Sequence, residues 1–130
     1  MLLMKCENFC KAAARLGEAL EEYAALPGST VVRDGVIQRF EFTFELAWKS
    51  LKEYMEDQGA EKMQFPKQVL KKAYAAGLIS DEEVWLDMLA SRNVTSHIYD
   101  DAQAARILTA IRDRYRQPFD RLADFYQEQS

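Results

Sequence analysis

Apolar residues recur at steps of three and four along most of this chain, a spacing that places them on one face of an α-helix. No long stretch alternates apolar and polar residues as a half-buried strand would. The chain is therefore predicted to be all-α. The first helix is predicted over residues 2–26, where charged residues separate the apolar series Leu2, Cys6, Phe9, Ala13, Leu16, Leu20 and Tyr23.

The longest helix is predicted over residues 31–58, with Gly59 as its stop. A helix with so broad an apolar surface either lies centrally in a bundle or has a second face to bury against a partner chain. Glu45 and Lys49 are spaced to pair on the remaining face. The apolar stripe consists of Ile37, Phe40, Phe44, Ala47, Trp48, Leu51 and Met55, widened by Phe42, Leu46 and Tyr54.

Two shorter helices are predicted in the middle of the chain. Pro66 is suited to the first turn of a short helix, and Gly77 lies just past its end. Ser80 and Glu83 then have the spacing of a capping box, which predicts that the next helix begins there.

The last helix is predicted to begin near Asp100 or Asp101, either of which can cap it. Pro118 is expected to kink or interrupt this helix, because proline lacks a backbone N–H. Short connections between helices favour an up-and-down antiparallel four-helix bundle with one short additional helix. The 130 residues are predicted to form a single domain, residues 1–130.

The charge balance argues against a general affinity for polyanions. Lys and Arg total 17 against 21 Asp and Glu, giving a net charge of −4, so any nucleic-acid contact must be local. No apolar run is long enough to span a bilayer, and the N-terminus lacks the pattern of a signal peptide. We expect no membrane association and a cytoplasmic location. Cys6 and Cys10 are expected to be buried, reduced thiols, and no metal or cofactor is expected.

One stretch departs from the pattern of apolar stripe and solvated face, namely residues 92–100. Arg92 brings a planar cation that fits phosphate, and His97 can exchange a proton near neutral pH. A base that activates a ribose hydroxyl and a cation that stabilises a phosphoryl transition state together allow a phosphodiester to be cleaved without a metal. Asn93 and Ser96 are candidate binding residues in the same stretch.

The spacing constrains how these groups can meet. On a continuous helix Arg92 and His97 point in different directions, whereas Asn93 and His97 share a face. Either the helix breaks between them, which Thr95 and Ser96 favour, or the site is built from two chains about a two-fold axis.

Structural interpretations stay open beside the catalytic one. Arg92 and His97 could instead be capping or ion-paired residues. Five arginines of the last helix could form a phosphate-facing strip, although a solvated face is the simpler interpretation; they are Arg106, Arg112, Arg114, Arg116 and Arg121. Glu41 and Glu45 share a helix face, but the Glu-x-x-His motifs of carboxylate-bridged metal bundles are absent.

The sequence resembles HEPN-domain proteins, small helical bundles of prokaryotic toxin–antitoxin and defence systems. Arg92, His97 and Tyr99 match their Arg-x4-His-x-Tyr signature. The chain is most similar to the branch named nucleotidyltransferase substrate-binding proteins. This similarity covers nearly the whole chain and is carried by residues 39–49, 77–79, 85–89 and 91–100.

The resemblance implies a homodimer that works with a minimal nucleotidyltransferase as a toxin–antitoxin pair. By this resemblance, His97 would be the general base towards a ribose 2′-hydroxyl, Arg92 would neutralise the scissile phosphate and Asn93 would orient it. The products would be a 2′,3′-cyclic phosphate and a 5′-hydroxyl. The partner would silence this ribonuclease by transferring AMP to Tyr99, because the added negative charge repels RNA.

The family name carries a second implication, a non-catalytic subunit that binds a nucleotide or other substrate for the nucleotidyltransferase. A third is a structural partner without an active cleft. All three interpretations use the same residues, so the sequence predicts the partnership and leaves the chemistry to be decided by the site.

Overall fold

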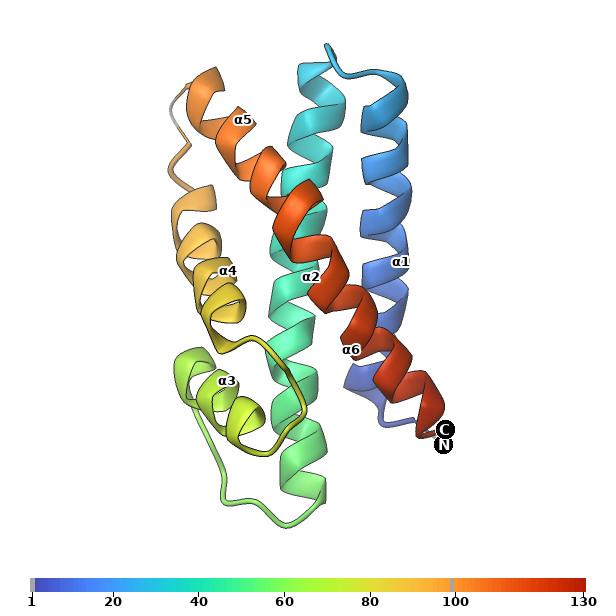
Figure 1. Cartoon of the computed structure of the whole chain (residues 1–130), viewed down its shortest axis with the longest axis vertical. Coiled ribbons are helices and arrows are strands. Elements are labelled where there is room, and N and C mark those ends of the chain that lie inside the picture. The colour runs from blue at the N-terminus through green and yellow to red at the C-terminus, as the bar shows by residue number, and fades with distance from the viewer. Residues whose placement is uncertain (1, 99) are drawn as a thin grey trace.

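The computed structural model describes residues 2–98 and 100–130, and within them every regular element is a helix. The helices run up, down, up and down, as Figure 1 shows, which confirms the predicted all-α bundle. The elements are α1 (Met4–Ala25), α2 (Thr30–Asp57), the short α3 (Pro66–Ala75), α4 (Glu82–Thr95), and a last rod made of α5 (Asp101–Ala110), a π-helical segment (Ile111–Tyr115) and α6 (Arg116–Glu128).

The helix ends follow from local chemistry. The Ser29 side chain accepts a hydrogen bond from the Val32 amide at 3.1 Å and caps the start of α2. Gly59 and Gly77 follow α2 and α3 with positive φ angles of 101° and 78°, a conformation that glycine adopts without steric cost. The predicted ends of both helices are therefore confirmed.

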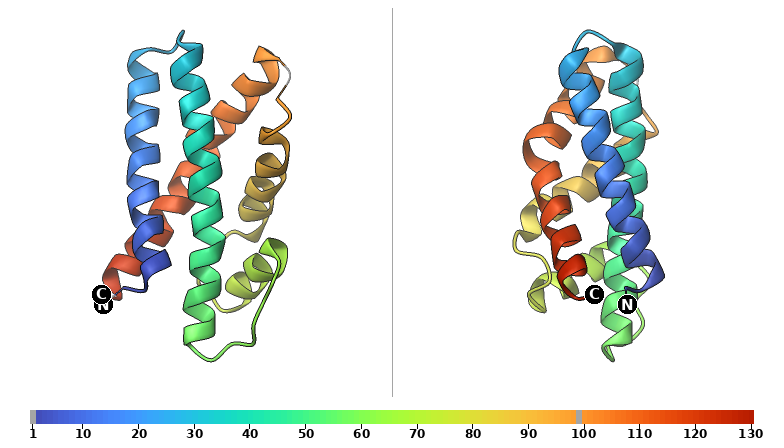
Figure 2. Two further views of the ribbon diagram at one scale, coloured as in Figure 1. Left: turned by 180° about the vertical axis from the view of Figure 1, so that it is seen from behind. Right: turned by 90° about the vertical axis from the view of Figure 1, so that its right-hand side faces the viewer.

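Helix α2 lies centrally, in contact with α1, α3, α4 and α5 (Figure 2). This confirms the first of the two explanations for its broad apolar surface. Leu46 and Tyr54 are half-buried, but Phe42 is 61% exposed and does not join the core. The side chains of α2 that pack inside the bundle include Phe40, Phe44, Ala47 and Leu51.

The two cysteines are both free thiols. Cys6 is buried, as expected, and donates to the carbonyl of Ser50 at 3.8 Å, whereas Cys10 is only half-buried. Burial raises the pKa of Cys6 to about 11, so this thiol stays protonated and unreactive near neutral pH.

The predicted capping box is wrong by one residue. Asp81, not Ser80, caps α4, and its carboxylate accepts from the Val84 amide at 3.2 Å. A carboxylate is at least as good a cap as a hydroxyl and also favours the positive end of the helix dipole. For the last helix the first of the two candidate caps is correct, since Asp100 accepts from the Gln103 amide at 2.7 Å.

Pro118 is accompanied by the predicted interruption of the α-helix, although the rod itself continues. It lies in the first turn of α6, directly after the π-helical turn Ile111–Tyr115. Proline removes one N–H from the helical ladder and its ring clashes with the carbonyl four residues earlier. The wider π turn changes the hydrogen-bond register ahead of the proline, which lets the rod continue.

No helix within residues 2–98 and 100–130 is both long enough and apolar enough to cross a membrane.

Candidate functional site

The predicted break in the helix lies between Arg92 and His97. Helix α4 ends at Thr95, whose hydroxyl donates to the Arg92 carbonyl at 2.8 Å, and Ser96 is its C-terminal cap residue. The His97 amide then closes a turn onto the Val94 carbonyl at 2.9 Å. Arg92 and His97 therefore do not lie on one continuous helix, and the angle of about 140° between their side chains that such a helix would impose does not apply.

Arg92 turns from α4 towards α2. One of its terminal nitrogens lies 3.2 Å from Glu45 Oε1, and its guanidinium carbon lies 5.8 Å from the centre of the Phe44 ring. Its Nε is buried and has no hydrogen-bond partner. The ion pair and the ring fix the guanidinium in place, and its side chain is still 29% exposed.

The other predicted site residues face solvent. Asn93, Ser96 and His97 are all exposed, so the imidazole is accessible and is not part of the core. Among the residues that the structure describes, no hydrogen bond or ion pair joins His97 to Arg92. Tyr99, the predicted AMP acceptor, lies outside the described residues. The chain thus presents the two key groups on either side of one helix end without linking them directly.

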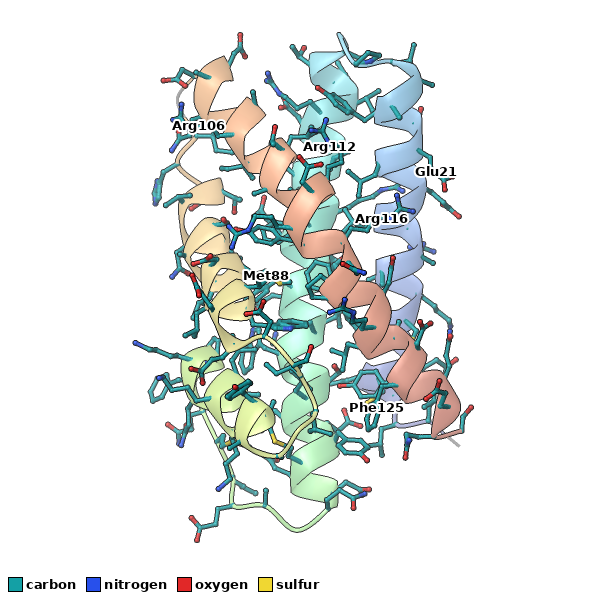
Figure 3. All side chains as sticks on the ribbon, in the orientation of Figure 1. Glu21, Met88, Arg106, Arg112, Arg116 and Phe125 are labelled. Atoms are coloured by element: carbon teal, nitrogen blue, oxygen red, sulfur yellow. The ribbon has the colours of Figure 1, made fainter. Side chains whose placement is uncertain are left out.

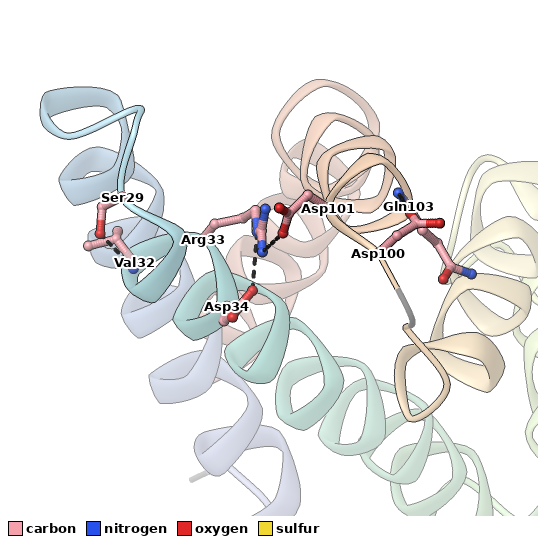
Figure 4. Close-up of polar contacts among 7 residues, drawn as sticks. All are labelled: Ser29, Val32, Arg33, Asp34, Asp100, Asp101 and Gln103. Atoms are coloured by element: carbon pink, nitrogen blue, oxygen red, sulfur yellow. Dashed lines mark hydrogen bonds and ion pairs between the residues drawn. The ribbon is translucent and has the colours of Figure 1, made fainter.

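Polar contacts anchor the start of α5 beside this helix end (Figure 4). Arg33 of α2 donates to Asp34 and to Asp101, both at 3.1 Å. The contact to Asp101 ties the N-terminal end of α2 to the first turn of α5.

A shallow pocket of about 350 Å³ opens next to this connection. Four carboxylates line it against a single arginine, so its potential is unfavourable for phosphate. This pocket is therefore a poor candidate for binding phosphate. Its lining residues are Arg33, Asp34, Ile37, Gln38, Glu41, Thr95, Ile98, Asp100 and Asp101.

The partner of Arg92 was not predicted from the sequence. The spacing predicted that Glu45 pairs with Lys49, and those two groups are 3.9 Å apart. Glu45 also accepts a hydrogen bond from the Trp48 indole at 2.9 Å and forms an ion pair with Arg92. The sequence feature that pointed to such a partner was the carboxylate of Glu45 on the polar face of a central helix. Its tertiary partner depends on how α4 packs, which spacing along one helix cannot reveal.

The arginines of the last rod are mainly compensated by acids. Arg112 pairs with Asp113, Arg114 with Asp87, and Arg116 with Glu21 and Asp120. Figure 3 shows Arg116 reaching from the rod towards Glu21 on α1. The solvated, ion-paired face is thus favoured over a phosphate-facing strip.

No cluster of three or more His, Cys, Asp or Glu side chains within residues 2–98 and 100–130 has the arrangement of a metal site. The acidic pair Glu41 and Glu45 therefore lacks the further protein ligands that carboxylate bundles supply. The chemistry that the described residues offer is that of a cation held by a carboxylate and an accessible imidazole.

Comparison with known proteins places the chain among helical bundles of one family. The family model described as "Nucleotidyltransferase substrate binding protein like" matches residues 4–128. A Haemophilus influenzae protein named "Probable ribonuclease HepT" is 36% identical over an alignment of 86 residues, and the match covers 61% of this chain and 57% of that protein. The matched region thus spans little more than half the length of this relative.

Two solved structures share the fold. A Thermus thermophilus protein superposes with a TM-score of 0.78 at 33% identity, over 90% of this chain and 97% of the other. A Haemophilus influenzae protein, described as having the fold of a substrate-binding domain of a nucleotidyltransferase, gives a TM-score of 0.82 at 24% identity, over 94% and 98% of the two chains. At that identity the second match supports the fold alone.

Proposed function

The chain belongs to the family of nucleotidyltransferase substrate-binding-like proteins, and from this premise we propose that it is the ribonuclease half of a toxin–antitoxin pair with a minimal nucleotidyltransferase. The observation that carries the proposal is the helix end at residues 92–97. There a fixed guanidinium and an exposed imidazole flank a single turn. The name of the HepT relative supports the same activity.

The proposed reaction is metal-independent transesterification of RNA. The His97 imidazole takes the proton from a ribose 2′-hydroxyl, and the 2′-oxygen attacks the neighbouring phosphorus. The bond from phosphorus to the 5′-oxygen breaks, and that oxygen leaves with a proton from imidazolium or water. Arg92 stabilises the extra negative charge on the phosphoryl oxygens. The products are a 2′,3′-cyclic phosphate and a 5′-hydroxyl.

Glu45 and Asn93 would have supporting roles. Glu45 holds the Arg92 guanidinium against Phe44, so the cation is oriented before substrate arrives, and preorganised charge is what lowers a barrier. Asn93 is exposed one residue further along α4, from which its amide could donate to a phosphate oxygen. Ser96, also exposed, offers a hydroxyl at the helix end.

We further propose that the active form is a homodimer. In one chain Arg92 leans towards α2, and no hydrogen bond within the described residues brings His97 to it. A two-fold axis near the end of α4 would place each His97 beside the Arg92 of the partner. Such a cleft would present two cations and two imidazoles to one RNA strand.

We propose that the nucleotidyltransferase silences this site by modifying Tyr99. The phenolic oxygen of Tyr99 would attack the α-phosphorus of ATP, forming a phosphodiester to AMP and releasing pyrophosphate. Tyr99 is two residues from His97 in the sequence. A nucleotide attached there would add a negative charge next to the cleft and repel the RNA backbone.

The test of the ribonuclease proposal is cleavage of single-stranded RNA by purified protein in the presence of EDTA. His97→Ala and Arg92→Ala should each abolish cleavage while the far-ultraviolet circular dichroism stays that of a helical bundle. Arg15→Ala, which removes an exposed arginine of α1, is the matched control and should cut normally. Cleavage at the wild-type rate by either site variant would refute the mechanism.

The test of the regulatory proposal is intact-mass measurement after incubation with the nucleotidyltransferase and ATP. AMP-sized additions to the wild type that are absent from Tyr99→Phe support modification at this residue. No addition to either protein would contradict it.

A second candidate function, a non-catalytic subunit that binds a nucleotide or substrate for the nucleotidyltransferase, is favoured by the description of the family model. In this function the Arg92 guanidinium, held by Glu45 and Phe44, would bind a phosphate group of the nucleotide without taking part in a reaction. This candidate predicts no cleavage, together with nucleotide affinity that is lost in Arg92→Ala. Calorimetric titration with ATP and AMP distinguishes it from the ribonuclease.

A further inference from the structure

Helix α3 and the loop before it carry a local excess of positive charge. Residues 62–74 contain four lysines and no aspartate or glutamate, in a chain whose net charge is −4. All four lysines are exposed. They are Lys62, Lys67, Lys71 and Lys72, here called the α3 lysine face.

The ion pairs of the molecule leave this face out. Within residues 2–98 and 100–130, the ion pairs involve cations of α1, α2, α4 and the last rod, and none involves the α3 lysine face. The arginines of the last rod, which look more basic in the sequence, are mainly paired. The α3 lysine face is therefore the stronger local attractor for phosphate groups.

Aromatic side chains stand out from the same segment. Phe65 is 65% exposed and Tyr74 is 47% exposed. Lys67, Lys71 and Tyr74 follow at i, i+4 and i+7 on α3, so they share one side of the helix. Exposed rings beside cations are the combination that holds single-stranded nucleic acid, since bases stack on the rings while the lysines contact the backbone.

A groove lies between α3 and the loop before it and is part of the α3 lysine face. It encloses about 370 Å³ and includes three of the four lysines. Three lysines outnumber the single carboxylate of the groove, Glu61, so its potential favours backbone phosphates. The lining residues are Glu61, Lys62, Met63, Gln68, Lys71, Lys72 and Ala75.

Helix α3, which carries the α3 lysine face, lies on the same side of the bundle as α4. Helix α3 contacts α4, and Figures 1 and 2 show α3 beside the start of α4, whose far end carries Arg92. The 14 residues of α4 correspond to about 21 Å along its axis. An extended strand of several nucleotides can therefore reach from one to the other.

We propose that the α3 lysine face is a binding site for single-stranded RNA that holds the substrate strand alongside α4. This inference rests on the proposed ribonuclease function for the identity of its ligand, but it concerns binding and requires no cleavage. The lysines supply sequence-independent contacts to phosphates, and Tyr74 and Phe65 supply stacking surfaces for bases. Recognition of the strand is thereby separated from the chemistry at the end of α4.

The test measures binding of the full chain to a fluorescent single-stranded 2′-O-methyl RNA of about 12 nucleotides, a length within the range that such sites hold. This probe lacks the 2′-hydroxyl nucleophile, so binding is read even if the protein cuts nothing. Lys71→Gln/Lys72→Gln should weaken binding about tenfold and flatten its dependence on salt, because two phosphate contacts are lost. Lys5→Gln/Lys11→Gln removes the same charge from exposed positions of α1 and should bind as the wild type does.

A second pair of variants tests the stacking surface. Tyr74→Ala should weaken binding about tenfold at every salt concentration, since stacking is not an ionic contact. Phe42→Ala, at another exposed ring on α2, is its control and should leave binding unchanged.

Three outcomes decide the proposal. Loss of RNA binding in the α3 variants alone supports it, even if the wild type shows no cleavage and the ribonuclease function fails. Equal weakening by the α1 lysine variant overturns it, because binding would then follow net charge only. Wild-type RNA affinity in the α3 variants with loss of binding to the nucleotidyltransferase also overturns it, and would assign the face to a protein partner.

Discussion

Two regions of this bundle contrast in how they treat polar groups. Where α1, α2 and α6 meet, buried polar side chains are paired: Thr43 donates to the Arg39 carbonyl at 2.7 Å, and Ser50 contacts the Tyr126 hydroxyl at 2.8 Å. At the end of α4, Asn93 and His97 stand exposed. The first region is built from satisfied contacts, and the second leaves groups available to a ligand.

The contrast follows from the cost of burying polar groups. A buried polar group without a partner costs free energy, so the interior tolerates only paired ones. At the end of α4 the one buried exception among the described residues is Nε of Arg92. The guanidinium keeps this unfavourable position because Glu45 and Phe44 hold it there.

The largest expected effect is in the aromatic core. Phe119 is 1% exposed, and its ring centre lies 5.5 Å from that of Trp85 and 6.0 Å from that of Phe9. Phe119→Ala should lower the free energy of unfolding by about 3–5 kcal/mol, because it removes buried area and leaves a cavity. Urea denaturation followed by circular dichroism measures this change.

The matched substitution in the exposed region is His97→Ala, which should change the free energy of unfolding by no more than about 0.5 kcal/mol. A loss of several kcal/mol in His97→Ala would show that the end of α4 is a structural element. The contrast between the two regions would then fail.

The next largest effect is a loss of folding stability at alkaline pH that comes from the buried thiol of Cys6. Burial raises the pKa of the Cys6 thiol from its ordinary 9.0 to about 11. Between these values the unfolded chain loses the proton first, so the stability contributed below pH 9 is lost as the pH rises towards 11. Between pH 8 and 10 the wild type should lose about 1 kcal/mol more than Cys6→Ala.

The measurement is urea denaturation of both proteins at the two pH values. Tyr126, whose pKa burial and its contact with Cys6 raise, is present in both proteins. Its ordinary pKa of 10.0 lies at the upper end of this pH range, so most of the difference between the two proteins belongs to Cys6. Parallel losses in the two proteins would mean that Cys6 ionises in the folded state as easily as in the unfolded one.

The sequence was sufficient for the helices because their signals are local. Periodicity predicted every long helix. Gly59 predicted where α2 ends, and Pro66 and Gly77 predicted where the short α3 begins and ends. Pro118 predicted an interruption of the last helix but not its place or form, because the interruption occurs upstream, in the π-helical turn Ile111–Tyr115. Packing of the rod against the bundle decides that place and form, and no local pattern reports them.

The candidate site was predictable in part. The break after Thr95 follows from the poor helix propensity of Thr95 and Ser96, and the exposure of His97 follows from the polarity of its surroundings. The pairing of Arg92 with Glu45 joins residues 47 positions apart. It depends on the register of α4 against α2, which spacing along the chain does not specify.

A smaller effect is expected at the N-terminal cap of α4, where the structure and the sequence spacing favour different residues. Asp81→Ala should lower the free energy of unfolding by about 1 kcal/mol, since the Val84 amide loses its acceptor. Ser80→Ala should have almost no effect, although sequence spacing favoured Ser80. Thermal denaturation of the two variants compares them directly, and equal losses would place the cap back at Ser80.

The smallest expected effect concerns the contact that borders the exposed region. Arg33 donates to Asp101, whose side chain is 86% exposed, and ion pairs of this kind contribute roughly 0.2–1 kcal/mol. Arg33→Gln should therefore hardly change global unfolding. Its effect should appear in hydrogen exchange, where the first amides of α5 lose protection while those of α1 keep theirs. Unchanged protection at the start of α5 would mean that the Asp100 cap alone fixes this helix and that the end of α4 needs no support from α2.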